Sequence, residues 1–172
     1  YRDLALRRVM VIGAGEAAAG ALKSLHERGV RDIVMVNRSA EHLAELVSRF
    51  EATTITLLDI GKHLHECDIV LSSTAAPHII LDAATIAAAV KLRKNRPLLL
   101  IDLAIPRDIE TGAAQIKGVH LYDLDYLQHV ATANRARRTA AITAAKAIVK
   151  EEVALFLRQQ QARAARQKRI SV

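Results

Sequence analysis

The chain has 172 residues, a length that suits one domain or one domain with an appendage. Hydrophobic residues make up 51% of it and aromatic residues only 3%, which excludes an aromatic-rich sandwich and favours helices packed on a parallel sheet. The formal net charge is +7, and the basic excess is concentrated after Glu152, where five Lys and Arg residues follow and no acidic residue does.

The sequence contains no run of the ~18 uninterrupted apolar residues that a membrane span needs, and no signal peptide at its start. The single cysteine, Cys67, excludes an internal disulfide framework and favours the reducing cytoplasm. Because the chain opens on Tyr1 directly before a strand, we expect it to be a piece of a longer protein.

The first half of the chain alternates short apolar runs with amphipathic segments. Val9–Ile12 predicts a strand that stops abruptly at Gly13, and residues 16–28 have the spacing of a helix. Ile33–Val36 predicts a second strand, and a second helix is expected over residues 41–50.

Further on, residues 54–57, 69–71, 98–101 and 119–122 predict four more strands, with a helix over residues 83–92. Strands that alternate with helices are typical of a parallel sheet with right-handed crossovers. The sequence therefore predicts an α/β fold, a doubly wound and mostly parallel Rossmann sheet, over residues 1–122.

A long helix is expected over residues 125–167, where neither Gly nor Pro occurs. Ile142, Val149 and Phe156 recur every seven residues and form one apolar seam. We therefore expect residues 123–172 to form a separate helical segment that packs on another helix.

A glycine-rich turn directly follows the first predicted strand and opens a helix. Gly13 would permit a tight turn, Gly15 would let the backbone approach a pyrophosphate, and Ala18 would allow close packing of helix on strand. The alternative is an ordinary tight turn, but the strand–turn–helix context favours dinucleotide binding. The predicted pyrophosphate-binding residues are Gly13, Ala14, Gly15, Glu16, Ala17 and Ala18.

The end of the second strand indicates which dinucleotide is bound. NAD-binding domains usually place Asp or Glu there to hold the ribose 2′-hydroxyl, whereas this chain has Asn37, Arg38 and Ser39. A guanidinium can bind a 2′-phosphate, and Ser39 can also cap the helix behind it. The pattern therefore predicts NADP, with a solvent-facing arginine beside a helix cap as the alternative.

Two further loops follow strands at the edge where open α/β sheets bind ligands. Ser72, Ser73 and Thr74 begin one of them, and residues 102–108 form the other. Either loop could line a nicotinamide, or its residues could simply cap the loop and stop the strand.

Five motifs occur together in a characteristic order. They are GAGE at 13–16, NRS at 37–39, DIVLSSTAAP at 68–77, LLLIDLAIPRD at 98–108 and LYDLDYL at 121–127. Over essentially its whole length the chain thus resembles the central NADPH-binding domain of glutamyl-tRNA reductase and the start of its spinal helix.

This resemblance implies an oxidoreductase that reduces glutamyl-tRNA to glutamate-1-semialdehyde in tetrapyrrole (porphyrin) biosynthesis. In that family a cysteine of a separate N-terminal domain forms a thioester, NADPH reduces it, and the long helix leads to a dimerisation domain. The resemblance therefore implies a homodimer through the C-terminal helix, and no catalytic residue in this piece, which alone would be inactive.

The resemblance assigns roles to the predicted site. The turn at 13–18 would hold the pyrophosphate, the segment at 37–39 the 2′-phosphate, and Ser72, Ser73 and Thr74 would approach the nicotinamide ribose. Ala17 and Ala18 stand where many members carry Met-Gly, and since pyrophosphate contacts come mainly from the backbone we expect no loss of binding.

Several other residues are interpreted as structural. Cys67, near two histidines, lacks the ligand spacing of a metal site, and half-buried packing is expected for it. Asp102 and Asp108 are interpreted as loop caps rather than an acid–base pair. The basic tail could contact tRNA phosphates, but solvated arginines are favoured because no aromatic residues are interleaved for stacking.

Two alternative functions stay open from the residues alone. One is an NADP-dependent dehydrogenase of the shikimate type, which uses a Lys–Asp pair from another domain. The other is a non-catalytic NADP-binding module whose basic helix holds nucleic acid or another partner.

Overall fold

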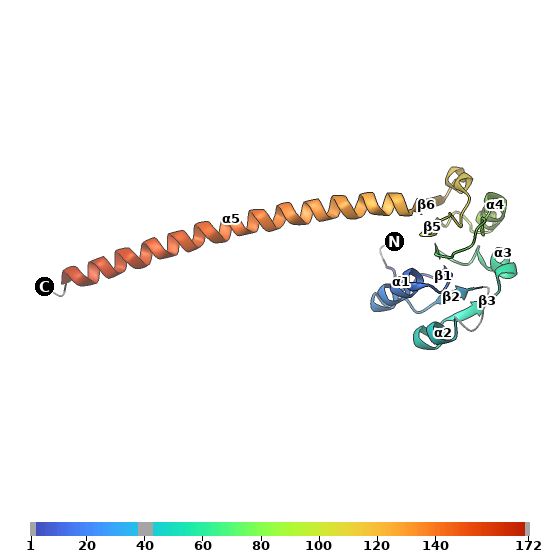
Figure 1. Cartoon of the computed structure of the whole chain (residues 1–172), viewed down its shortest axis with the longest axis horizontal. Coiled ribbons are helices and arrows are strands. Elements are labelled where there is room, and N and C mark those ends of the chain that lie inside the picture. The colour runs from blue at the N-terminus through green and yellow to red at the C-terminus, as the bar shows by residue number, and fades with distance from the viewer. Residues whose placement is uncertain (1–2, 38–42, 171–172) are drawn as a thin grey trace. The chain divides into compact units, whose positions relative to one another are not determined.

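The computed structural model describes residues 3–37 and 43–170 (Figure 1). The chain divides into two compact units, Tyr1–Leu127 and Gln128–Val172. The first is an α/β domain and the second belongs to one long helix. This division lies a few residues beyond the one expected between 122 and 123.

The first unit is built on a sheet of six parallel strands in the order β3-β2-β1-β4-β5-β6. This is the strand order of a Rossmann fold, so the predicted doubly wound α/β class is confirmed. The order reverses between β1 and β4, which makes their carboxyl ends the switch point where such sheets bind ligands. The strands are β1 (Val9–Ile12), β2 (Ile33–Val36), β3 (Thr53–Ile55), β4 (Ile69–Ser72), β5 (Leu98–Asp102) and β6 (Val119–Asp123).

The helices follow the predicted order, with short additions. Residues 57–63 and 111–115 form helical turns that the sequence did not predict, because each is too short to show a periodic pattern. The third strand was predicted to reach residue 57, but Leu57 instead begins a 3₁₀ turn. The described helices are α1 (Glu16–Glu27), α2 (Ala44–Phe50), η1 (Leu57–Asp59), α3 (Ile60–His63), α4 (Ala83–Lys91), η2 (Thr111–Gln115) and α5 (Leu124–Ile170).

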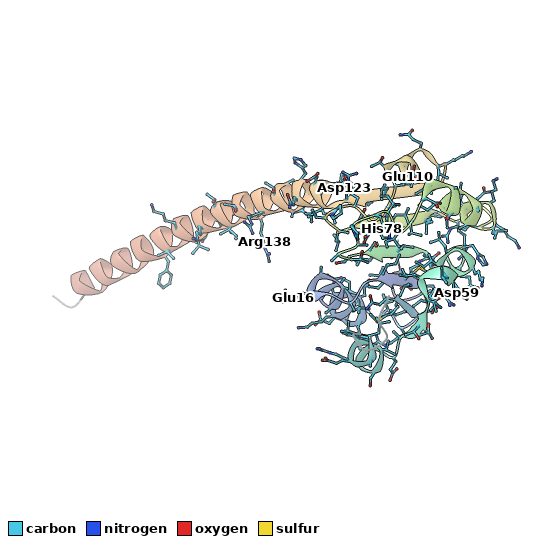
Figure 2. The ribbon with its side chains drawn as sticks, turned by 45° about the vertical axis from the view of Figure 1, so that its right-hand side comes forward. Glu16, Asp59, His78, Glu110, Asp123 and Arg138 are labelled. Atoms are coloured by element: carbon cyan, nitrogen blue, oxygen red, sulfur yellow. The ribbon has the colours of Figure 1, made fainter. Side chains whose placement is uncertain are left out.

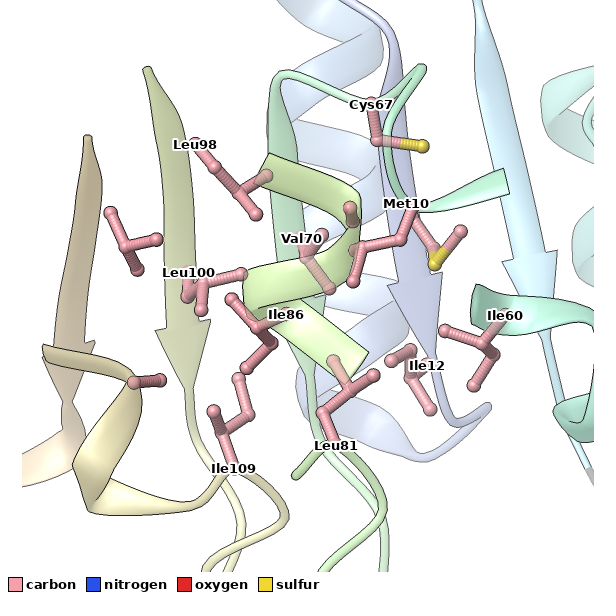
Figure 3. Packing of buried hydrophobic residues seen from close by; sticks show 14 of the residues in the cluster. Met10, Ile12, Ile60, Cys67, Val70, Leu81, Ile86, Leu98, Leu100 and Ile109 are labelled. Atoms are coloured by element: carbon pink, nitrogen blue, oxygen red, sulfur yellow. The ribbon is translucent and has the colours of Figure 1, made fainter. Parts of the chain in front are cut away.

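Alternate residues of the central strand face two separate cores. Met10 and Ile12 of β1 pack with the residues of α3, α4 and η2, whereas Val9 and Val11 pack with those of α1 and α2. Figure 3 shows the first core, in which Ile86 of α4 belongs to the same cluster as the strand residues. Both faces of the sheet are therefore covered, which explains why β1, β2 and β4 are buried at every position.

A buried arginine closes the end of the sheet where β4 begins. The Arg93 side chain is 1% exposed and donates to the carbonyl oxygens of His65, Cys67 and Pro97. Its Nη2 also lies 3.5 Å from a carboxylate oxygen of Asp68. Arg93 thus joins the loop before β4 to the loop before β5, and sequence reasoning missed it because these partners lie far apart in the sequence.

Cys67 is buried at this same end of the sheet. Its thiol has no exposed surface and donates to the carbonyl oxygen of His63 at 3.6 Å. Burial raises the pKa of the Cys67 thiol to about 11. The expected packing role is therefore correct in kind, but the side chain is fully buried rather than half-buried. Within residues 3–37 and 43–170, no group of three or more His, Cys, Asp or Glu side chains is arranged to hold a metal ion.

Asp123 caps the start of α5. Its Oδ1 accepts the backbone N–H of Tyr126 at 2.9 Å, and its Oδ2 lies 2.6 Å from Nη2 of Arg107. Further along α5, the seam residues Ile142, Val149 and Phe156 are 50%, 61% and 58% exposed. Among the described residues, no helix is both long and apolar enough to cross a membrane.

Candidate dinucleotide site

In the turn between β1 and α1, the backbone at Gly13 packs directly against the backbone of the loop that follows β4. Gly13 has φ +106°, a conformation that side chains disfavour, and its N–H donates to the carbonyl oxygen of Val36 at 2.8 Å. A Cβ at this position would lie 2.3 Å from the carbonyl oxygen of Ser73. The neighbouring Ser73 N–H donates to Ile12 at 2.9 Å. Gly13 is therefore required by the protein itself, because the loops after β1 and β4 touch here.

Gly15 lies in the same turn but has different surroundings. It is the N-cap of α1, with φ −75° and ψ −178°, and none of the described side chains accepts from the first turn at this cap. A Cβ at Gly15 would meet no atom of the described residues within 4 Å. None of those residues therefore packs against the start of α1 at this point, and its N–H groups and dipole favour an anion there.

The other residues of the turn differ in exposure. Ala18 is fully buried in the core shared with α2, as expected for the position that needs close packing, while Ala14 is half-buried. Glu16 and Ala17 are exposed. Figure 2 labels Glu16 in the first turn of α1 and His78 in the loop that follows β4.

Two cavities adjoin the carboxyl end of β2. Both are lined by Asn37 and Leu57. The larger, of about 540 Å³, extends between α2 and the segment after β3, and the smaller, of about 230 Å³, extends toward the loop after β4. Asn37 is half-buried at the junction, and Arg38 and Ser39 lie outside the described residues.

The smaller cavity is lined mainly by the loop after β4. Its walls are Ile12, Val36, Asn37, Leu57, Thr74, Ala75, Ala76, Pro77 and Ile80. The cavity thus opens where β1, β2 and β4 end, which is the switch point of the sheet.

The hydroxyl groups of this loop are engaged with Asp108. Ser72 is fully buried and its Oγ donates to Asp108 Oδ2 at 2.7 Å. Thr74 donates its N–H to Oδ2 at 2.9 Å and its hydroxyl to Oδ1 at 2.6 Å. The Ser72 side chain therefore points into the protein rather than into the cavity, whereas Thr74 lines the cavity. A contact of Ser73 and Thr74 with a nicotinamide ribose stays a prediction.

Asp102 holds the loop that carries Asp108. Its carboxylate accepts the N–H groups of Ala104 at 3.1 Å, Asp108 at 3.1 Å and Ile109 at 3.0 Å. Asp102 and Asp108 are 2% and 0% exposed. The interpretation of both as loop caps is thus confirmed, and the contact of Asp108 with the loop after β4 is an addition that the sequence did not indicate.

The geometry can hold an extended ligand with an anionic centre. The start of α1 offers N–H groups that no described side chain caps, and the cavities beside Asn37 offer apolar walls to flat rings. The chain's one thiol lies before β4, at the opposite end of the strand from Ser72, so it takes no part in this site.

Comparison with known proteins agrees with this geometry. A family model described as shikimate / quinate 5-dehydrogenase matches residues 1–130. Glutamyl-tRNA reductase from Photobacterium profundum is 37% identical over 157 residues, which cover 91% of this chain and 37% of that protein. The enzyme from Psychromonas ingrahamii is 42% identical over 149 residues, covering 86% and 36%. The chain therefore spans little more than a third of the length of these curated relatives.

Solved structures give the same result. Glutamyl-tRNA reductase from Methanopyrus kandleri superposes with a TM-score of 0.78 at 35% identity, covering 87% of this chain and 38% of that one. The nucleotide-binding domain of the Thermoplasma volcanium enzyme, at 18% identity and a TM-score of 0.62, covers 77% and 86% and supports the fold alone. The chain therefore belongs to the family described as shikimate / quinate 5-dehydrogenase, and the resemblance to glutamyl-tRNA reductase that its motifs predicted is confirmed.

Proposed function

We propose that this chain is the NADP(H)-binding part of a glutamyl-tRNA reductase, which reduces glutamyl-tRNA to glutamate-1-semialdehyde in tetrapyrrole biosynthesis. The observation that carries the proposal is the start of α1 at Gly15, where no atom of the described residues lies within 4 Å of the place of a Cβ, together with the smaller cavity at the switch point of the sheet. Packing against the described residues does not require a glycine at that position, whereas the close approach of a pyrophosphate would.

The preference for NADP over NAD rests on the end of β2. Asn37 occupies the position where an NAD-binding domain would place a carboxylate, so no negative charge is contributed there to repel a 2′-phosphate. Arg38 follows directly and supplies a guanidinium, and Ser39 supplies a hydroxyl. The adenosine half would then occupy the larger cavity, between α2 and the segment after β3.

The nicotinamide half would lie toward the loop after β4. Bound NADPH would supply the hydride, and the residues of this chain would bind and orient it. Ser73 and Thr74 lie at the switch point, where they can hold the ribose next to the nicotinamide. No described residue is assigned a catalytic role, and the thioester-forming cysteine of the family would come from another part of the protein.

Cys67 is not that nucleophile. The thiol is fully buried, and its pKa of about 11 leaves almost no thiolate near neutral pH. A buried free thiol also suits the reducing cytoplasm, where we place the protein. We also propose that the substrate is glutamyl-tRNA and that the protein forms a homodimer through α5.

Calorimetric titration with NADPH, NADH and 2′-phospho-AMP tests the cofactor assignment. NADPH should bind at least about tenfold more tightly than NADH, and Arg38→Ala should abolish most of that difference. Arg31→Ala is the matched control, because Arg31 precedes β2, at the opposite end of the strand, and bonds only local carbonyls among the described residues. Equal affinity for NADH and NADPH would refute the 2′-phosphate assignment.

A second candidate function follows from the family model, whose description names shikimate and quinate dehydrogenases. The two candidates predict different substrates for the intact protein. A glutamyl-tRNA reductase should oxidise NADPH only with charged glutamyl-tRNA, whereas a shikimate dehydrogenase should reduce NADP with shikimate alone. Turnover of shikimate without tRNA would favour the second candidate.

A further inference from the structure

Asp108 contacts both ends of the loop that lines the smaller cavity. At the start of the loop, its carboxylate accepts the Ser72 hydroxyl together with the N–H and hydroxyl of Thr74. At the end, its backbone carbonyl oxygen accepts the N–H groups of Ile80 at 2.7 Å and Leu81 at 3.0 Å. One residue thus spans the loop, so that the conformation of residues 73–79 depends on it.

Asp108 is itself held rigidly from β5. Asp102 ends that strand, and its Oδ2 accepts the N–H groups of Asp108 and Ile109. A parallel bridge between Leu81 and Ile109 aligns the two segments next to this contact. The position of Asp108 is therefore set by the sheet rather than by the loop that it contacts.

Burying Asp102 and Asp108 is an unfavourable arrangement if the only role of the two residues is to stabilise the fold. Asp102 and Asp108 are both buried, and among the side chains that the structure describes no Lys, Arg or His lies within ion-pair distance of either. Their described partners are neutral N–H and O–H groups, and burying a carboxyl group without a counter-charge costs free energy. What the pair provides instead is a fixed geometry for residues that form the cavity wall.

We propose that Asp108 is a positioning residue for the dinucleotide: it fixes the loop after β4 in the conformation that binds NADPH, and Asp102 supports it. This inference rests on the proposed function, because the ligand of the cavity is taken to be the dinucleotide. Asp108 contacts no cofactor atom in this assignment, and it acts through Thr74, which lines the cavity.

The test compares Asp108→Asn with Asp68→Asn. Asp68 is also a buried aspartate, but it precedes β4 at the opposite end of the strand, where it pairs with Arg93 and Arg96. Both variants should have lower melting temperatures. Only Asp108→Asn should bind NADPH about tenfold or more weakly in calorimetry well below its melting temperature, because a loop that samples other conformations lowers apparent affinity.

Hydrogen exchange measured without ligand gives a second readout. In Asp108→Asn the amides of residues 74, 80 and 81 should exchange faster than in the wild type, whereas in Asp68→Asn they should not. A folded Asp108→Asn protein that binds NADPH normally and shows unchanged exchange would overturn the proposal. If the wild type bound neither dinucleotide, the proposed function would fail, and the exchange data would still decide whether Asp108 orders the loop.

A pair of variants at Thr74 covers the case in which Asp108→Asn does not fold. Thr74→Val removes the hydroxyl that donates to Asp108 and accepts from the Ala76 N–H, and Thr74→Ser keeps that hydroxyl. NADPH affinity should fall in the valine variant and be restored in the serine variant. Equal affinities in the two variants would count against positioning through this contact.

Discussion

At the scale of single residues, the two glycines of the first turn have different physical causes. Gly13 combines a positive φ with a carbonyl oxygen where its Cβ would be, so the protein's own packing requires glycine. Gly15 has an ordinary φ, and no atom of the described residues lies within 4 Å of the place of its Cβ, so packing against those residues does not require glycine there. The two roles can be separated by alanine substitutions.

Gly13→Ala should lower the free energy of unfolding by at least about 1–2 kcal/mol, because alanine in this conformation is strained and meets Ser73. Urea denaturation of the two proteins measures the difference. A variant as stable as the wild type would show that the turn can relax without cost.

Gly15→Ala should lower the free energy of unfolding by no more than the ~1 kcal/mol that alanine costs at an N-cap, since no atom of the described residues lies within 4 Å of the added Cβ. NADPH should nevertheless bind about tenfold or more weakly, because the methyl group would occupy the space of the pyrophosphate. Calorimetry on the folded variant checks this. Unchanged affinity would remove the observation on which the proposed function depends.

Cys67 gives a prediction of pH dependence. Its pKa is raised by burial to about 11, so above the unfolded value near pH 9 the thiol ionises in the unfolded chain while it stays protonated in the fold. Stability should fall as pH rises, by ~1 kcal/mol for this group at about pH 10. In Cys67→Ala the free energy of unfolding should fall less between about pH 8 and pH 10 than in the wild type. Urea denaturation at the two pH values measures the difference. An identical decline in both proteins would contradict it.

At the scale of elements, α4 has a titratable cap. Asp82 accepts the Thr85 N–H at 2.6 Å, and this hydrogen bond lowers the pKa of the Asp82 carboxyl. The stabilisation is therefore present above the unfolded pKa and is lost as pH falls through the lower folded pKa. Asp82→Ala should reduce the melting temperature by a few degrees at neutral pH and by less near pH 3. Asp82→Asn, which keeps a hydrogen-bond acceptor, is the control. A decrease in the melting temperature of Asp82→Ala that does not vary with pH would contradict the role of the Asp82 carboxylate as the cap.

The elements also show how far sequence reasoning reaches. Strands such as Val9–Ile12 and Leu98–Asp102 were predictable because burial on both faces leaves continuous apolar runs, and the turn at Gly13 was predictable because it directly follows such a run. The contact of Ser72 with Asp108 was not, because it joins residues 36 positions apart that meet only through strand order. The cavities beside Asn37 were likewise hidden, since turns after β3 help to form them.

At the scale of the whole molecule, the seam of α5 predicts self-association. Exposed apolar side chains at Ile142, Val149 and Phe156 repeat with the seven-residue period of a coiled coil. The wild type should sediment as a dimer. A variant that carries Ile142→Ser, Val149→Ser and Phe156→Ser together should sediment as a monomer. Thr143→Ser, which removes no apolar seam residue, is the control. A wild-type monomer at concentrations of about 100 µM would refute association through this helix alone.

The side chains of the basic residues after Glu152 lie outside what the structure describes, so a contact with tRNA stays a prediction.

Arg107 and Asp108 are neighbours in one loop, and they contact different parts of the domain. Asp108 holds the wall of the cavity, while Arg107 pairs with Asp123, the last residue of β6 and the cap of α5. The α/β domain is therefore not separable at the sheet, because residues just beyond it belong to its packing. A module cut after residue 122, one residue short of the end of β6, would lose Asp123 and the ring of Tyr126 that stacks on Tyr122. A transplant that runs through residue 127 would keep the Arg107–Asp123 pair and the stacked Tyr122 and Tyr126 rings, and it should fold with a higher yield.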